Sequence, residues 1–164
     1  MKKLNILVGL SGAGKSTWRN KYVYENPGTL VLCRDSLREA LTGLSAAEYN
    51  QHPITFVENT ISDLIEAITY DWVERGKKDL IIDQTNLRKR YIDQHLKHTL
   101  GQVKTELILI DTPLDVCKQR VVERDGILYP DYIEKQAKQL EEIKRQITFD
   151  KIISYETIEI GEQH

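Results

Sequence analysis

The sequence predicts an α/β fold in three layers, in which a central and mainly parallel sheet lies between helices. Short apolar runs at residues 4–10, 30–33, 80–82, 107–110 and 152–160 alternate with helical patterns at residues 15–25, 53–75, 88–99, 114–124 and 130–147. Strands and helices that alternate in this way form right-handed crossovers between parallel neighbours. The apolar runs are rich in Val, Ile and Leu, which is typical of parallel strands covered on both faces.

The length and charge of the chain limit what it can be. Its 164 residues and 19.0 kDa fit a single domain, which we expect to extend over residues 1–164. A formal net charge of -2 disfavours binding of long nucleic acid on a large basic face, but it is compatible with a grip on a few phosphates. No apolar run could span a membrane, and the Met-Lys-Lys start leads directly into a strand. We therefore expect a cytoplasmic protein without membrane contacts, whose oligomeric state the sequence leaves open.

The first predicted strand leads into a phosphate-binding motif. Residues 9–17, here called the phosphate loop, read Gly9-Leu10-Ser11-Gly12-Ala13-Gly14-Lys15-Ser16-Thr17 and match G-x-x-x-x-G-K-[ST] between a strand and a helix. Glycines allow backbone N–H groups to turn toward phosphates, and the helix that begins at Lys15 adds its own free N–H groups. We predict that Gly9, Ser11, Gly12, Ala13, Gly14, Lys15, Ser16 and Thr17 bind ATP or another nucleoside triphosphate. Lys15 would contact the β and γ phosphates, and Ser16 would hold Mg²⁺.

The second apolar run ends in a carboxylate between two arginines. Asp35 follows Arg34, and Arg38 lies one helical turn further on if Ser36 opens a helix. A carboxylate beside cations stays ionised, so Asp35 could accept a hydroxyl proton while that hydroxyl attacks phosphorus. Arg38 could then hold a phosphate of the acceptor. The alternative is a helix-capping aspartate with a surface arginine, which would not explain the paired arginines.

The residues that follow predict a connection and then a long buried helix. Residues 42–53 read as a polar connection in which Ser45 and Glu48 could form a capping box. Apolar residues then recur at helical spacing from Ile54 to Trp72, so this face is expected to belong to the core. The final helix begins with Pro130 and Asp131, a favourable order for a helix start.

Two further runs end in aspartates at the same edge of the sheet as the phosphate loop. Asp83-Gln84-Thr85-Asn86 follows the third run and Asp111-Thr112-Pro113 the fourth. Ligands bind outside the carboxyl ends of parallel strands, and Asp83 and Asp111 each have the form of a Walker B acid that supports Mg²⁺. Spacing does not choose between them, and each could instead cap the following helix.

Arg120 and Arg124 lie one turn apart on a predicted helix, just before a break at Asp125 and Gly126. Arginines in such a position can move over the γ phosphate and neutralise charge during transfer, an effect worth about 10³ to 10⁵ in rate. An ordinary salt-bridged face is the alternative, since Glu123 is adjacent. The break up to Pro130 predicts a mobile flap.

Other polar groups favour no separate site. Arg88-Lys89-Arg90 is more typical of a solvated helix start than of a phosphate track. Cys33 and Cys117 belong to no CxxC or Cys/His cluster, so we expect buried, reduced thiols. The four histidines, His52, His95, His98 and His164, show no metal-ligand spacing, and a solvated helix face is the simplest interpretation of His95 and His98.

Taken together, these motifs resemble the kinase domain of the bacteriophage polynucleotide kinases, within the wider group of P-loop phosphotransferases. The resemblance covers residues 5–145 and is carried by Gly14-Lys15-Ser16-Thr17-Trp18, Arg34-Asp35-x-x-Arg38, Asp83-x-Thr85-Asn86-Leu87, Arg120 and Arg124. The phosphate loop alone is generic, whereas the Arg-Asp-x-x-Arg element with the arginine pair is more specific. The resemblance implies a P-loop kinase fold with a helical lid at about residues 115–135.

The same resemblance implies a 5′-hydroxyl kinase acting on ends of RNA or DNA, with ATP or another nucleoside triphosphate and Mg²⁺. The implied catalytic residues are Lys15, Asp35, Arg38, Arg120 and Arg124; the acceptor-binding residues are Arg34, Asp35, Arg38, Thr85 and Asn86; and the metal-binding residues are Ser16 and Asp83. Asp35 would be the general base for the 5′-hydroxyl, Arg38 would bind the 3′-side phosphate, and Arg120 and Arg124 would bind the donor phosphates. Nucleic-acid repair follows from this resemblance, in the host cytoplasm if the protein is phage-encoded.

Two departures and two alternatives accompany the resemblance. The Asp-x-Asp-Gly-Thr signature of a phosphatase domain is missing, so we expect a kinase only, and the extra Gln84 leaves open which side chain near Thr85 meets the acceptor. A small-molecule hydroxyl kinase for a nucleoside, sugar or antibiotic could use the same loop, base and lid. A nucleotide-dependent switch without phosphotransfer is disfavoured, because no Asn-Lys-x-Asp or Asp-x-x-Gly element is found.

Overall fold

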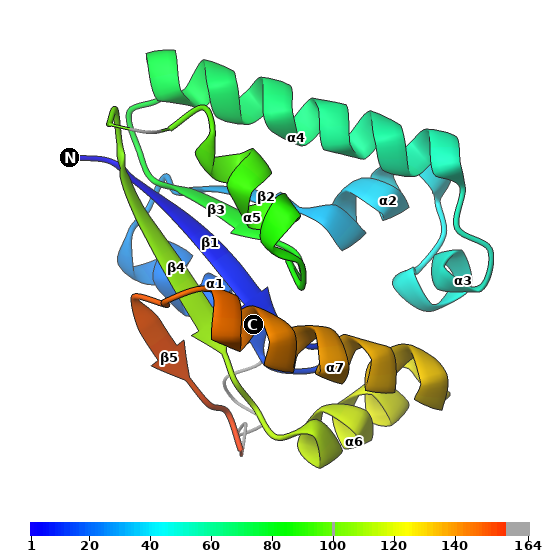
Figure 1. Ribbon diagram of the computed structural model, residues 1–164. Helices are drawn as coiled ribbons and strands as arrows, with labels where there is room; N and C mark the ends of the chain where they lie inside the picture. Colours follow the sequence, from blue (N-terminus) through cyan, green and yellow to red (C-terminus); the bar gives the residue numbers. More distant parts are fainter. Residues whose placement is uncertain (100, 157–164) are drawn as a thin grey trace.

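A computed structural model of the protein describes residues 1–99 and 101–156. In chain order its elements are β1 (Lys3–Gly9), α1 (Lys15–Glu25), β2 (Leu30–Cys33), α2 (Arg34–Thr42), α3 (Ala46–Gln51), α4 (Thr55–Arg75), β3 (Leu80–Asp83), α5 (Lys89–Leu96), β4 (Lys104–Ile110), α6 (Leu114–Asp125), α7 (Pro130–Gln146) and β5 (Lys151–Ile153). The described strands form one parallel sheet in the order β2-β3-β1-β4-β5 (Figure 1). This architecture confirms the predicted α/β fold.

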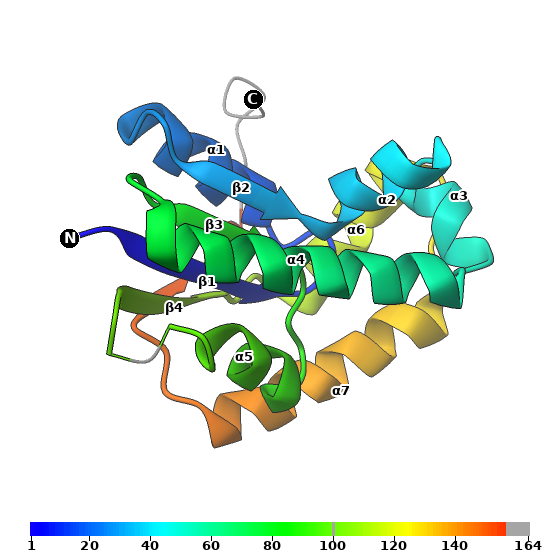
Figure 2. The same cartoon turned by 90° about the horizontal axis from the view of Figure 1, so that it is seen from above.

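The layers follow from the order of the strands. The chain moves from β1 past β3 to β2 in one direction, and afterwards it moves from β2 to β3, β4 and β5 in the opposite direction. Right-handed crossovers therefore place α1 on one face of the sheet and α4, α5 and α7 on the other. Figures 1 and 2 show this division, with α1 behind the sheet and α5 and α7 in front of it.

The centre of the sheet is the centre of the core. Leu4, Ile6 and Leu7 of β1 are inaccessible to solvent, as are Ile81 of β3 and Ile108 of β4. Adjacent side chains of a strand point to opposite faces, so burial of consecutive residues requires cover on both sides. The apolar runs in the sequence have this origin.

The long helix α4 crosses one face of the sheet and is fixed at its end. Ile61, Ile65 and Trp72 are buried at helical spacing, as predicted. The Lys2 ammonium donates to the carbonyls of Trp72, Val73 and Gly76, at 2.7, 2.8 and 2.9 Å. A cation at this position satisfies free carbonyls and complements the negative end of the helix dipole.

Several element boundaries differ from the prediction. Helix α2 begins at Arg34, directly after β2 and before Ser36, and α5 ends at Leu96 rather than at residue 99. Strand β4 begins at Lys104 rather than at residue 107, because the buried Glu106 carboxylate is neutralised by Lys3 at 3.3 Å. Strand β5 covers only residues 151–153, and residues 157–160 of the predicted strand lie outside the described residues.

Two local predictions have opposite outcomes. The capping box at the start of α3 is confirmed, since the Glu48 N–H donates to the Ser45 hydroxyl and the Glu48 carboxylate accepts from the Ser45 N–H. Both cysteines are free thiols and Cys117 is buried, but Cys33 is only half-buried because it ends the edge strand β2.

Among the described residues, no helix is both long and apolar enough to cross a bilayer.

Candidate active site

The carboxyl ends of the strands open into one cleft of about 1030 Å³ between α2, α4, α5 and α6. This volume is at the upper end of the usual range for small-ligand pockets. The cleft brings together most of the residues singled out in the sequence: residues 11–17, Arg34, Asp35, Arg38, Asp83, Thr85, Asn86, Arg120 and Arg124. Gly9 does not line the cleft, because it lies behind the loop, where a β-carbon would come within 2.9 Å of the Ile110 carbonyl oxygen.

The phosphate loop is wound tightly against α6 and the segment after β5. Gly12 and Gly14 have φ angles of 78° and 107°, which disfavour any residue with a side chain. A β-carbon at Gly12 would lie 2.7 Å from the Cys117 carbonyl oxygen, and one at Gly14 would lie 2.7 Å from the Tyr155 ring. Both glycines are therefore required by conformation and by space.

Lys15 and the start of α1 provide the positive charge of the loop. The Lys15 ammonium donates to the carbonyls of Gly9 at 3.1 Å and Leu10 at 2.7 Å. Burial lowers the pKa of Lys15, while the charges of Asp83 and Asp35 act against this shift. No side chain caps the N-terminus of α1, and its first residues, Lys15, Ser16 and Thr17, line the cleft, so its first N–H groups are available to an anion there.

Two braces that the sequence did not reveal hold the loop in place. Gln136 of α7 is 5% exposed; its Oε1 accepts from the Ser11 N–H at 3.2 Å, and its Nε2 donates to the Ser11 hydroxyl at 3.2 Å. The Thr112 hydroxyl donates to the Ala13 carbonyl at 2.6 Å and accepts from the Tyr155 N–H at 3.0 Å. A sequence signal for Gln136 does exist, because this glutamine interrupts an otherwise apolar helical stripe.

The two candidate metal-supporting aspartates lie in different surroundings. Asp83 lines the cleft and is buried, and its Oδ2 accepts from Nη1 of Arg19 at 2.6 Å. Asp111 pairs with Lys144 at 2.8 Å and is not part of the cleft wall. Arg19, which the sequence reading missed, lies on α1 one turn after Ser16. Of the two aspartates, only Asp83 thus lines the cleft.

Asp35 and the flanking arginines form a network with a carboxylate from another helix. Arg38 Nη1 donates to Asp35 Oδ1 at 2.8 Å, while its Nε and Nη2 donate to both carboxylate oxygens of Glu58 at 3.0 and 2.6 Å. Arg34 turns toward α4 instead of Asp35; its Nη2 donates to the Glu58 carbonyl at 2.8 Å. The Tyr49 hydroxyl completes the network by donating to Glu58 at 2.7 Å.

Charge fixes the protonation of this network. Burial raises the pKa of Glu58, but hydrogen bonds from Arg38 and Tyr49 and the charges of both arginines outweigh burial and bring it to about 2. Burial lowers the pKa of Arg38, but the hydrogen bonds and charges of Glu58 and Asp35 outweigh burial and raise it overall. An ionised carboxylate therefore holds the Arg38 guanidinium beside Asp35 at neutral pH. Glu58 was not found from the sequence.

The loop after β3 is tied to β1 by a buried amide. Asn86 is 2% exposed and has a φ of 50°; its Nδ2 donates to the Leu7 carbonyl at 2.8 Å, and its Oδ1 accepts from Gln84 Nε2 at 2.8 Å. Thr85 borders the cleft with its side chain, while its carbonyl accepts from the Gly9 N–H at 3.1 Å. The Asn86 amide is thus engaged within the protein.

The expectation that His95 lies on a solvated face is wrong. His95 is 9% exposed, and its Nε2 lies 3.1 Å from Asn86 Oδ1. Burial and the charge of Arg34 lower its pKa to about 4, so the ring is neutral at pH 7. His98 pairs with Glu66 at 2.9 Å, and His164 lies outside the described residues.

Arg120 and Arg124 both reach the cleft from α6. Arg120 donates to the carbonyls of Gly12, at 3.4 Å, and Tyr155. Arg124 forms two hydrogen bonds with Asp125, at 2.8 and 3.0 Å, which raise its pKa together with the charges of Asp125 and Asp35. Its ion-pair partner is therefore Asp125, and it lies within electrostatic reach of Asp35 across the cleft.

Comparison with known proteins agrees with this geometry. A family model described as an AAA domain (AAA_33) matches residues 4–149. The chain belongs to this family. A chain in the structure of the Pnkp1/Rnl/Hen1 RNA repair complex is similar to this AAA domain, with a TM-score of 0.77 and 25% identity. The match covers 90% of this AAA domain and 47% of the other chain, so the protein spans about half the length of that relative.

Small-molecule kinases share the fold of this AAA domain at lower identity. A gluconokinase from Sinorhizobium meliloti 1021 has a TM-score of 0.58 and 18% identity, over 92% of this chain and 81% of its own. Shikimate kinase from Acinetobacter baumannii, in complex with shikimate, has a TM-score of 0.60 and 14% identity, over 99% of this chain and 87% of its own. The AAA domain is thus a P-loop kinase domain, a fold that implies nucleotide binding.

Proposed function

We propose that this AAA domain is a polynucleotide 5′-hydroxyl kinase, which transfers the γ-phosphate of ATP or another nucleoside triphosphate to 5′-hydroxyl ends of RNA or DNA during repair. The observation that carries this assignment is the Asp35–Arg38 pair, which shares one cleft with the phosphate loop. The 25% identity to a chain of the Pnkp1/Rnl/Hen1 RNA repair complex supports it. Residues 1–164 act as one kinase domain, with residues 115–135 as the lid.

The donor side suits a triphosphate with Mg²⁺. The phosphate loop lines the cleft with Gly12 and Gly14 in positive-φ conformations, and α1 begins there without a side-chain cap, so its first N–H groups are available to an anion. Within residues 1–99 and 101–156 no three His, Cys, Asp or Glu side chains form a metal cage. Ser16 and Asp83 would therefore hold Mg²⁺ jointly with phosphate oxygens, as this class of fold does. When bound, the ion neutralises charge on the β and γ phosphates.

The acceptor side supplies a base and a phosphate clamp. Asp35 accepts the proton of the 5′-hydroxyl, whose oxygen forms a bond to the γ-phosphorus. The bond between that phosphorus and the β–γ bridging oxygen breaks, and its electron pair leaves with the nucleoside diphosphate. Arg38 binds the phosphate on the 3′ side of the first nucleotide, with Glu58 holding the guanidinium in place. Arg120 and Arg124 neutralise the transferred phosphoryl group from α6.

Transfer of labelled γ-phosphate tests the assignment directly. The acceptors are 5′-hydroxyl RNA and DNA oligonucleotides, with 5′-phosphorylated oligonucleotides and free nucleosides as controls. We expect label on the 5′-hydroxyl oligonucleotides and none on the phosphorylated ones. Label on nucleosides without label on any oligonucleotide would refute the assignment.

A small-molecule hydroxyl kinase is the second candidate, because the wall of the cleft includes neutral polar side chains suited to a polyol, Asn59, Ser62 and Gln94. The acceptor phosphate distinguishes the two functions. Arg38→Ala should reduce kcat/KM far more for an acceptor with a 3′-phosphate than for the matching nucleoside. Arg75→Ala removes an exposed arginine that pairs with Asp71 at the far end of α4, and it should affect neither acceptor. Equal losses on both acceptors would favour the small-molecule kinase.

A further inference from the structure

The wall of the cleft includes residues of α5 as well as the phosphate loop and Asp35. Helix α4 contributes to the same wall, and two residues of α5, Tyr91 and Gln94, also border a shallow depression of about 550 Å³. The depression is completed by Arg90, Asp93 and Lys97. We call Arg90, Tyr91, Gln94 and Lys97 the α5 track. Because two residues are shared, the cleft and the depression are neighbours on α5.

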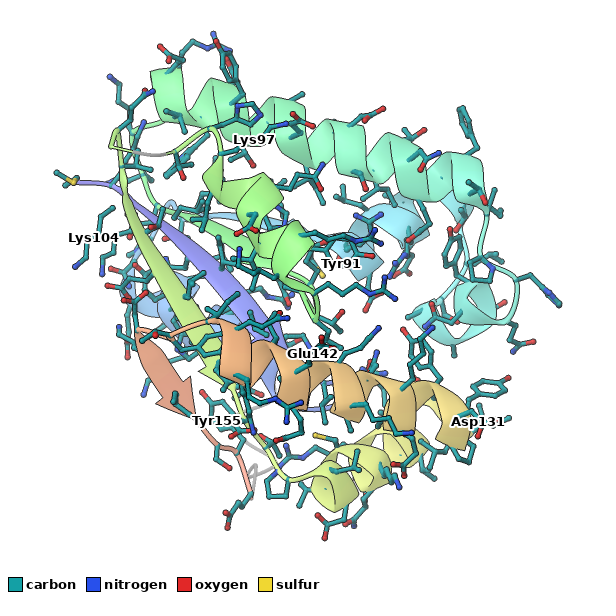
Figure 3. All side chains as sticks on the ribbon, in the orientation of Figure 1. Tyr91, Lys97, Lys104, Asp131, Glu142 and Tyr155 are labelled. Carbon is teal, nitrogen blue, oxygen red and sulfur yellow. The ribbon has the colours of Figure 1, made fainter. Side chains whose placement is uncertain are left out.

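The α5 track combines a flat aromatic face with cations. Tyr91 is 38% exposed, and the Arg90 guanidinium lies 4.9 Å from its ring centroid and donates to its hydroxyl at 3.1 Å. Figure 3 shows Tyr91 at the end of α5 that faces the cleft and Lys97 near the other end, beside α4. Aromatic rings interleaved with cations are the usual means of binding single-stranded nucleic acid, because every base can stack and every linkage carries a negative charge.

The charges around the track leave a positive excess. Four cationic side chains lie on α5 or directly flank it: Arg88, Lys89, Arg90 and Lys97. The carboxylates that pair with them are Asp93 on the helix and Glu66 on α4. Lys89 pairs with Asp93 at 2.7 Å, and Lys97 pairs with Glu66 at 3.2 Å. Lys97 is 54% exposed, so its pairing is weak and a phosphate can compete for it. His98 contacts the same Glu66 oxygen, so Lys97 shares that carboxylate.

We propose that the α5 track binds the second and third nucleotides of the acceptor strand, with Tyr91 stacked on a base and Arg90 and Lys97 on phosphates. This role rests on the proposed function and extends it, because it makes the preferred acceptor a strand rather than a single nucleotide. Of the basic residues at the start of α5, Arg90 thereby belongs to the substrate path. A wide basic face is unnecessary, which fits a net charge of -2.

The test measures kcat/KM for acceptors of increasing length. The series comprises a nucleoside 3′-monophosphate and the matching dinucleotide, trinucleotide and tetranucleotide, each with a 5′-hydroxyl and a 3′-phosphate. For the wild type, kcat/KM should rise up to the trinucleotide. Tyr91→Ala should cost the trinucleotide about tenfold more than the mononucleotide, within the range of one lost base stack. Tyr91→Phe keeps the ring and should retain the length dependence.

Binding without transfer supplies an independent readout. Anisotropy of a labelled 5′-hydroxyl oligonucleotide, titrated over a range of salt, reports the number of phosphate contacts. Arg90→Ala combined with Lys97→Ala should make the negative slope of log K against log salt shallower by about 1.4, since each phosphate contact with a single strand contributes about 0.7. Lys21→Ala combined with Arg75→Ala removes the same charge elsewhere and should leave the slope unchanged.

The possible results separate the track from the kinase assignment. The track is overturned, while the kinase assignment stands, if the wild type shows no rise in kcat/KM from mononucleotide to trinucleotide. The same holds if Tyr91→Ala reduces kcat/KM equally for both acceptors. Oligonucleotide binding that weakens in Tyr91→Ala, without phosphorylation of any acceptor, supports the track and overturns the kinase assignment. If oligonucleotides are neither bound nor phosphorylated, both the track and the kinase assignment are overturned.

Discussion

Asp35 and Asp71 are two aspartates in similar local settings. Each pairs with an arginine one helical turn later, Arg38 or Arg75, and their side chains are 56% and 55% exposed. They differ in location, since Asp35 borders the cleft at the start of α2 and Asp71 lies near the end of α4. Asp71 is thus a matched control for the proposed base.

Asp35→Asn should lower kcat by about 10² to 10⁴, the usual contribution of a general base. Asp71→Asn should change kcat by less than about twofold, because it alters only an exposed ion pair. Steady-state kinetics at saturating ATP and acceptor measure both values. A loss below tenfold in Asp35→Asn would show that the base is another group.

Glu58 should make the stability of the protein sensitive to acid. Its pKa is about 2 in the folded protein, against an ordinary value of 4.5, so its ion pairs contribute fully above about pH 4.5 and are lost as the pH falls toward 2. Glu58→Gln should reduce the free energy of unfolding at neutral pH by roughly 2 kcal/mol, since it weakens charged hydrogen bonds. Urea denaturation at several pH values measures this difference.

The pH dependence of that difference is the critical observation. The difference in free energy of unfolding between the wild type and Glu58→Gln should narrow as the pH falls below about 4.5, because the wild type then loses the negative charge that the variant lacks. Glu74→Gln, an exposed change on the same helix, should stay within about 0.5 kcal/mol of the wild type throughout. A constant gap down to about pH 3 would contradict the low pKa of Glu58.

Sequence patterns found the residues of the site that are local, but not those that depend on the fold. Arg38 follows Asp35 by three residues, so helical geometry alone brings the two side chains together, at 2.8 Å. Glu58 reaches the same guanidinium from a different helix, and Arg19 reaches Asp83 from another layer of the fold. Contacts of this kind depend on tertiary packing, which no spacing rule describes.

At the scale of elements, α7 supports the phosphate loop through Gln136. Gln136→Leu should raise KM for ATP by about tenfold while KM for the acceptor stays the same, because it leaves a Ser11 N–H without its partner. Gln146→Leu, an exposed change near the end of the same helix, should have no such effect. Initial rates over a grid of ATP and acceptor concentrations separate the two constants. A parallel rise in both would indicate general unfolding.

The strands were predictable where their own apolar residues account for their burial. A strand end was missed where burial depends on residues from other strands. The apolar runs located β1, β2 and β3 to within one residue. The start of β4 was missed because Glu106 is neutralised by Lys3 of β1 and Lys151 of β5, at 3.3 and 3.2 Å, as well as by Lys104 of its own strand at 3.4 Å. Two of these three partners come from strands far apart in sequence.

For the whole molecule, nucleotide binding should appear as a gain in thermal stability. A non-hydrolysable ATP analogue with Mg²⁺ at 100 times its Kd should add about 2.7 kcal/mol. For a domain of this size that gain corresponds to a rise in Tm of roughly 5 to 10 °C. Lys15→Met should abolish most of the rise, whereas Lys21→Met on the exposed side of α1 should preserve it. Calorimetry with and without EDTA measures these shifts and their dependence on the metal.

The position of the cleft was predictable from the sequence, because the carboxyl ends of parallel strands meet at one edge. This rule correctly gathered Asp35, Asp83 and the phosphate loop. It also nominated Asp111, which instead pairs with Lys144 because α7 packs beside the end of β4. Which strand ends face the ligand depends on the helices that cover the others.

The carboxylate of Glu58 also acts as an internal competitor. It holds the Nε and Nη2 edge of the Arg38 guanidinium, while Asp35 accepts from Nη1. Free inorganic phosphate can therefore meet only the N–H groups that remain on Nη1 and Nη2, whereas the phosphate of the proposed acceptor is tethered to a hydroxyl held elsewhere in the cleft and so has a high effective concentration. The result is a filter against the small anions of the cell, which keeps the acceptor site available to chains that carry both groups.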